Sequence, residues 1–183
     1  MRRTAESPLR PQPAPERADD ERSAEDRLAL EAALRYLNKR ERSHAEVRRH
    51  LTRGGFGREP VARALSSLTD QGALDDRRFA RLFAQDKREL EQWGNERIRR
   101  ALLERGIEAD TVAAALAEGD GTDGSCMSER DRALELLRRR FPSPPRERRE
   151  RDRALGVLLR KGYEFELALE AITALARAET PLE

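Results

Sequence analysis

SHAEVRRHLTRGGF, residues 43–56, contains the signals for the start, the body and the end of one helix. Ser43 lies three residues before Glu46, the spacing of a capping box, in which the two side chains satisfy free backbone amides at a helix start. Gly54 and Gly55 come next and suit the left-handed turn that ends many helices. Phe56 is expected to fold back as the apolar contact after that turn. The stretch therefore predicts a short, capped helix closed by a glycine turn.

The same template occurs three times along the chain. Each copy has two apolar residues four apart, a glycine, a large apolar residue and a second apolar pair, which predicts a helix, a glycine turn and another helix. The copies are Val47, Leu51, Gly55, Phe56, Val61 and Leu65; Ile98, Leu102, Gly106, Ile107, Val112 and Leu116; and Ala154, Leu158, Gly162, Tyr163, Ala168 and Ile172. Three matches in order indicate an internal repeat.

A further apolar helical pattern precedes each copy, so each unit is expected to hold three helices in about 50 residues. These patterns are Leu30, Ala33, Leu34 and Leu37; Phe79, Leu82 and Phe83; and Leu134, Leu137 and Phe141. No stretch shows a convincing strand pattern. We therefore predict an all-α protein of three tandem three-helix repeats in an elongated, curved array.

The expected domain organisation follows these units. The N-terminal stretch has four prolines among mixed charges, which is typical of a disordered tail. The stretch between the second and third units is rich in glycine and acidic residues, which is typical of a flexible linker. The predicted ranges are a tail at 1–23, repeats at 24–72, 73–118 and 129–178, a linker at 119–128 and a tail at 179–183. We expect some freedom of movement between the second and third repeats.

The composition combines high charge of both signs with few aromatic residues. Charged residues make up 39% of the chain, yet 37 Lys and Arg against 35 Asp and Glu give a net charge of only +2. Such a balance excludes a uniformly basic coat for nucleic acid, so any basic binding surface must be local. No apolar run is long enough to span a membrane. The single cysteine, Cys126, excludes an internal disulfide framework. We predict a cytoplasmic monomer without membrane contact.

No spacing typical of a catalytic site, a phosphate loop or a metal centre is present. His44 and His50 are six residues apart, on different faces of a helix, and no ligand set surrounds either. Cys126 has no histidine paired with it in the sequence. Asp75 and Asp76 are better explained as helix caps than as binding residues. We predict no catalytic residue, no cofactor and no metal.

The basic residues of the middle helices are the candidate binding residues. Val47, His50 and Leu51 are expected to face inward in the first middle helix, which leaves its arginines exposed. The candidates are Arg48, Arg49 and Arg53 in the first; Arg97, Arg99 and Arg100 in the second; and Arg149, Arg153, Arg160 and Lys161 in the third. Residues 138–153 form the most basic segment, where attraction for phosphate would not depend on base sequence. For any single arginine, the alternative is a solvated helix face on which Glu and Arg support each other.

Several motifs resemble the RecX family of bacterial regulatory proteins. They are RERSHAEVRRHL, LTDQGALDDRRFA, WGNERIRRALLERGI and LLRKGY, and the resemblance covers roughly residues 24–178. The sharpest motif is GALDDRRFA, residues 72–80. The chain departs from the family pattern where Trp93 and Asn95 flank Gly94, and the role of Trp93 is open.

The resemblance implies a function that spacing alone does not. RecX-like proteins are non-enzymatic regulators that bind the RecA recombinase, lie in the groove of its nucleoprotein filament and inhibit strand exchange and ATP hydrolysis. The implied partners are RecA and the RecA–DNA filament, with weak non-specific contact with DNA, in homologous recombination, DNA repair and the SOS response.

Two alternatives remain open. A DNA-binding transcriptional regulator of the helix-turn-helix type would need base-reading side chains in the last helix of a unit. The predicted last helices, EPVARALSSL, ADTVAAALAEG and EFELALEAITALA, are poor in such side chains. Charge and pattern alone also leave open a protein–protein adaptor.

Overall fold

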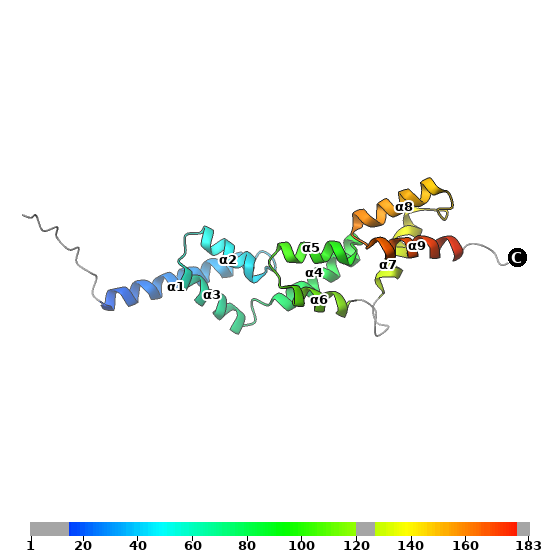
Figure 1. The fold of residues 1–183 in the computed structure, drawn as a ribbon. Coiled ribbons are helices and arrows are strands. Elements are labelled where there is room, and N and C mark those ends of the chain that lie inside the picture. Colours follow the sequence, from blue (N-terminus) through cyan, green and yellow to red (C-terminus); the bar gives the residue numbers. More distant parts are fainter. Residues whose placement is uncertain (1–14, 120–126, 179–183) are drawn as a thin grey trace, which may run out of the picture.

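The computed structural model describes residues 15–119 and 127–178, which form nine α-helices and no strand (Figure 1). The helices follow one another along the long axis of the molecule in three groups of three. Repeat 1 holds α1 (Pro15–Leu37), α2 (His44–Arg53) and α3 (Arg58–Asp70); repeat 2 holds α4 (Asp76–Glu91), α5 (Asn95–Glu104) and α6 (Ala109–Glu118); repeat 3 holds α7 (Glu129–Arg140), α8 (Arg148–Lys161) and α9 (Phe165–Ala178). The predicted all-α array of three-helix repeats is confirmed.

Each repeat has its own apolar core, because the described buried residues fall into three separate clusters. Val47 and Leu51 are buried in the first, Ile98 and Leu102 in the second, and Leu158 in the third. Burying an aliphatic side chain of this size stabilises a fold by about 1.5–3 kcal/mol. The repeated apolar spacing in the sequence thus corresponds to three small cores.

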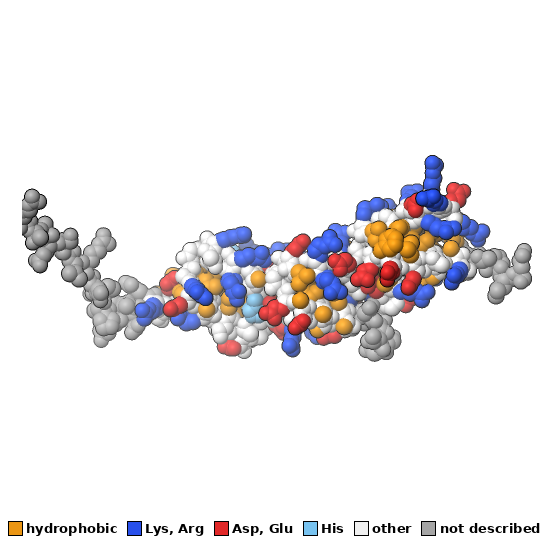
Figure 2. All heavy atoms as spheres, viewed as in Figure 1, with side chains coloured by type: hydrophobic (Ala, Val, Ile, Leu, Met, Phe, Trp, Pro, Cys, Tyr) orange, Lys and Arg blue, Asp and Glu red, His pale blue; other side chains and the backbone are white. Residues whose placement is uncertain are grey.

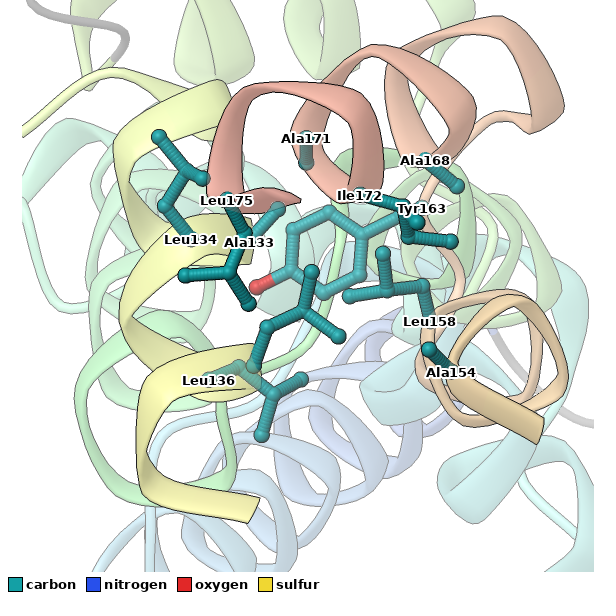
Figure 3. Packing of buried hydrophobic residues seen from close by; sticks show 11 residues of the cluster. Ala133, Leu134, Leu136, Ala154, Leu158, Tyr163, Ala168, Ala171, Ile172 and Leu175 are labelled. Carbon is teal, nitrogen blue, oxygen red and sulfur yellow. The ribbon is translucent and has the colours of Figure 1, made fainter. Parts of the chain in front are cut away.

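The third core is built around an aromatic ring. Tyr163 follows α8 and is 2% exposed. Figure 3 shows its ring in the middle of the cluster, between Leu158 of α8, Ile172 of α9 and Ala133 of α7. The large apolar residue that follows the glycine turn therefore joins all three helices of the repeat.

The helix caps predicted from the sequence are present. The Ser43 hydroxyl accepts a hydrogen bond from the Glu46 amide at 3.1 Å, and the Ser43 amide donates to Glu46 Oε2 at 3.1 Å. Asp75 caps α4, because its carboxylate accepts from the Arg78 and Arg77 amides. These bonds, above all the one from Arg78, lower the pKa of Asp75 below its ordinary value.

The middle helices of the repeats dock end to end. At the start of α2, the Ser43 hydroxyl donates to the Arg105 carbonyl at the end of α5, at 2.7 Å. At the start of α5, the Gly94 amide donates to the Lys161 carbonyl at the end of α8, at 2.9 Å. The positive end of one helix dipole therefore meets the negative end of the next, which is favourable. The same end-to-end contact between middle helices thus joins repeat 1 to repeat 2 and repeat 2 to repeat 3.

A polar network reinforces the junction between repeats 2 and 3. The Asn95 amide and side chain donate to the two carboxylate oxygens of Glu129, each at 2.7 Å. Arg88 donates to Asn95 Oδ1 at 3.0 Å and to the Leu116 carbonyl at 2.8 Å. Helices α4, α5, α6 and α7 are thereby held together. These contacts come from residues outside the linker and oppose movement at the junction, and the expected freedom between the repeats stays a prediction.

The N-terminal part of the chain becomes helical earlier than expected. Helix α1 begins at Pro15, inside the range 1–23 that we expected to be disordered. Proline is well suited to the first turn of a helix, because that turn has no internal acceptor for its amides. Residues 1–14, the linker residues 120–126 with Cys126, and the C-terminal residues 179–183 lie outside the described part.

Some helix faces differ from the sequence pattern. His50 is exposed rather than inward, and its ring stacks on Tyr36 with 4.0 Å between centroids. Leu82 is 41% exposed, whereas Ala80 and Ala84 on the same helix are fully buried. The face of α4 that packs on the core therefore includes the two alanines, and Leu82 lies on the flank of this face.

Candidate partner-binding surface

The ten predicted binding residues all lie on the three middle helices. Helix α2 has Arg48, Arg49 and Arg53; α5 has Arg97, Arg99 and Arg100; and α8 has Arg149, Arg153, Arg160 and Lys161. All are exposed except Lys161, which is half-buried. Because these helices dock end to end, Lys and Arg side chains gather along one edge of the molecule, over α2, α5 and α8 (Figure 2). We call this surface the basic edge.

The arginines of the basic edge differ in their local partners. Arg99 and Arg100 both pair with Glu96, at 3.5 and 3.6 Å, so much of their charge is balanced locally. Arg49 donates through Nε to the Ala45 carbonyl at 3.2 Å. Within the described residues, Arg48 and Arg53 have no such carboxylate partner. The arginines of the basic edge therefore differ in their local partners, although all of them lie on exposed helix faces.

The structure brings part of the basic edge together into a groove of about 400 Å³ between repeats 2 and 3. We call it the junction groove. Its lining residues come from the end of α4, from α5 and from the last turns of α7 and α8: Gln92, Arg97, Leu136, Arg139, Arg140, Val157, Arg160 and Lys161. Every charged residue that lines it is basic.

Contacts across the junction hold two of these cations in place. Arg97 donates to the Arg160 carbonyl at 3.1 Å, and its guanidinium lies 4.0 Å from the centroid of the Trp93 ring. Lys161 donates to the Glu91 carbonyl at 2.6 Å. Trp93 thus lies against Arg97 at the junction and provides a ring over which its guanidinium is placed.

The positive potential beside the groove affects a nearby carboxylate. Glu91 pairs with Lys87, and this hydrogen bond is the main reason why the pKa of Glu91 lies below its ordinary value. The charges of Lys87, Arg97 and Lys161 lower that pKa further. The surroundings of the groove therefore favour negatively charged groups.

Two of the five basic residues that line the groove were not among the predicted site residues. Arg139 and Arg140 were noted only as members of the basic segment 138–153. The run Arg138, Arg139 and Arg140 closes α7, where basic residues favour the negative end of the helix dipole. That run was the available signal, but its nearness to α5 and α8 could not be read from it. Conversely, Arg149 and Arg153 do not line the groove.

Comparisons with known proteins agree with this architecture. Residues 29–68 match the family model described as RecX, first three-helix domain, and residues 75–116 match the second three-helix domain. The chain is 33% identical over 156 residues to Regulatory protein RecX of Xanthomonas axonopodis pv. citri, covering 84% of this chain and 89% of that protein. It is 29% identical over 167 residues to Regulatory protein RecX of Mycolicibacterium smegmatis, covering 88% and 86%.

A solved structure has the same fold. The crystal structure of RecX from Lactobacillus salivarius superimposes with a TM-score of 0.71 at 20% identity, over 84% of this chain and 97% of that one. Among the described helices, none is long and apolar enough to cross a membrane.

The fold and the surface define an elongated helical-repeat protein that presents basic side chains along its docked middle helices. The chain belongs to the RecX family of regulatory proteins.

Proposed function

We propose that this protein is a non-enzymatic, monomeric, cytoplasmic regulator that binds RecA and the RecA–DNA filament and inhibits ATP hydrolysis and strand exchange. It would thereby modulate recombination and DNA repair, including the SOS response. Membership of the RecX family is the reason for naming RecA as the partner.

The basic edge is the observation that carries the proposal. Three middle helices docked end to end form one long track, and a long track can follow a filament. The track carries the candidate residues of all three repeats, together with Arg139 and Arg140 at the junction groove. A filament of protein on DNA presents phosphates and carboxylates, and both attract guanidinium groups.

The test is the rate of ATP hydrolysis by RecA on single-stranded DNA as the protein is titrated. We expect inhibition at near-stoichiometric amounts, irrespective of DNA sequence. Charge reversal in Arg48→Glu/Arg53→Glu, or in Arg139→Glu/Arg160→Glu, should raise the half-inhibitory concentration at least tenfold, because each pair replaces attraction with repulsion.

The matched control is Arg130→Glu/Arg177→Glu, which makes the same charge change at exposed residues of α7 and α9 outside the groove. This variant should inhibit as the parent does. Absence of any effect of the folded parent protein at large excess would rule out the proposed function. Equal loss of inhibition in the control would rule out a specific role for the basic edge.

A further inference from the structure

The positive charge of the junction groove is only partly balanced by its surroundings, where Glu91 interacts with Arg97 and Lys161. Its five charged lining residues are all basic, and no carboxylate lines it. Arg97 and Lys161 donate to backbone carbonyls rather than to acids. In the described part of the chain, no carboxylate pairs with Arg139 or Arg140. A negatively charged ligand would supply the missing partners.

The rest of the lining is aliphatic and amide. Leu136 is buried and Val157 is half-buried, and both pack with the repeat 3 core. Gln92 completes the lining and has a left-handed backbone with φ 54°, which is uncommon for a residue other than glycine. A side-chain amide can donate to a carbonyl and accept from a backbone amide. The groove therefore offers cations, an apolar floor and a polar group able to pair with a peptide backbone.

Single-stranded nucleic acid fits this lining less well. Proteins that bind it combine a basic groove with aromatic rings on which the bases stack. The ring of Trp93 lies beside the groove but is covered by two cations. The Arg97 guanidinium carbon lies 4.0 Å from the ring centroid and the Lys87 Nζ 4.9 Å from it, and the Phe83 ring packs edge-on against the indole. None of the lining residues is aromatic. Phosphates would use the cations but would leave the accessible aliphatic surface, chiefly that of the half-buried Val157, uncovered.

The groove is also preformed. It lies at the docked ends of α5 and α8, where the Glu96 amide donates to the Gly162 carbonyl at 3.2 Å. Tyr163, at the centre of the repeat 3 core, donates to the Gln92 carbonyl at 3.4 Å. A ligand would therefore meet side chains that the junction already positions, and preorganisation of this kind favours affinity.

From this combination, we infer that the junction groove binds an acidic peptide segment of a partner protein, in which carboxylates alternate with aliphatic side chains. The carboxylates pair with Arg139, Arg140 and Arg160, and the aliphatic side chains cover Leu136 and Val157. The inference rests on the proposed function in that the same surface meets the partner, but it concerns the chemistry of the segment that enters the groove.

The experiment measures binding of a short fluorescein-labelled peptide, in which pairs of aspartate or glutamate flank single leucines, by fluorescence anisotropy with the full chain. We expect Arg139→Glu/Arg140→Glu to weaken binding at least tenfold, and Arg139→Ala/Arg140→Ala to weaken it less. Arg130→Glu/Arg177→Glu should bind as the parent does. Circular dichroism establishes that each variant is folded. A peptide with serine in place of leucine should bind several-fold more weakly, because the apolar floor loses its partner.

Oligodeoxythymidine provides the competing arm. If it displaces the peptide as effectively as unlabelled peptide does, the groove is a nucleic-acid site and the inference is overturned. Failure of the parent to bind the peptide, or equal affinity in the groove variants, overturns it as well.

The same proteins are assayed for inhibition of RecA, which separates the two proposals. Inhibition without peptide binding overturns the inference alone, whereas peptide binding without inhibition supports the inference and overturns the proposed function.

Discussion

Glycine is required for two reasons at the positions where the middle helices end. Gly55, Gly106 and Gly162 have φ values of 86°, 82° and 88°, the left-handed region in which side chains are strained. At Gly106, a side-chain carbon would also overlap with Ala45 of the preceding repeat, and at Gly162 it would overlap with Arg97. At Gly55 nothing lies within 4 Å. The turn thus requires glycine in every repeat, and close docking requires it again at the two junctions.

Because Tyr163 is buried, we expect repeat 3 to become less stable at alkaline pH. Burial, as the main cause, raises the pKa of Tyr163 from its ordinary 10.0 to about 12. Below pH 10 the phenol is neutral in both states, so stability is unaffected. Above pH 10 the unfolded chain loses this proton first, so the free energy of unfolding should fall by up to about 2–3 kcal/mol as the pH approaches 12.

The measurement for Tyr163 is urea unfolding of the parent and of Tyr163→Phe between pH 8 and 12. The phenylalanine variant keeps the ring in the core and has no proton to lose. Above pH 10, the free energy of unfolding should therefore fall less in the variant than in the parent. A difference that is independent of pH would contradict the assigned cause.

At the scale of the element, the contact between helix ends determines how the repeats are joined. A side-chain carbon at Gly94 would overlap with the backbone of Gly162 and Tyr163, which cannot move without disturbing the core. Gly94→Ala should therefore destabilise the protein by about 1–3 kcal/mol, the usual cost of overpacking. A lower thermal midpoint and faster hydrogen exchange at the start of α5 and the end of α8 would report the loss.

The chain offers a closely matched control for this substitution. Gly57 caps α3 with φ −65° and ψ 163°, and Gly94 caps α5 with φ −76° and ψ 161°. At Gly57 the nearest atom to an added carbon is Glu25 Oε1, at an ordinary 3.4 Å. The substitution Gly57→Ala makes the same change at a helix cap without a steric overlap. It should therefore lower the thermal midpoint less than Gly94→Ala does. Equal effects would mean that capping, rather than docking, explains the loss.

At the scale of the whole molecule, three small cores in a row give an extended shape rather than a sphere (Figure 1). A compact domain of this length has a radius of gyration of about 16 Å. We expect small-angle X-ray scattering of the protein to give a clearly larger value that does not change with protein concentration. A value near that of a compact domain would contradict the extended array.

Much of the fold could be predicted from the sequence, because helix caps and apolar spacing are local properties. The Ser43 cap, the turn at Gly55 and the buried pair Val47 and Leu51 are all present as expected. His50 was placed wrongly because the edge of an apolar stripe depends on the neighbouring helix, and Tyr36 of α1 supplies a ring on which the exposed His50 stacks. The binding roles of the ten candidate residues stay a prediction.

The number and kind of helices, their turns and the family can be read from the sequence, because these depend on residues that are close along the chain. The hydrogen bonds that join repeats 2 and 3 through Asn95 and Glu129, and the groove shared by Arg97, Arg139 and Arg160, are seen only in the folded molecule. These residues are far apart in sequence, and they meet only because α5 docks on the end of α8 while α7 packs on the same repeat. The charges along the chain are thus local information, whereas their combination into a binding groove is a consequence of helix docking.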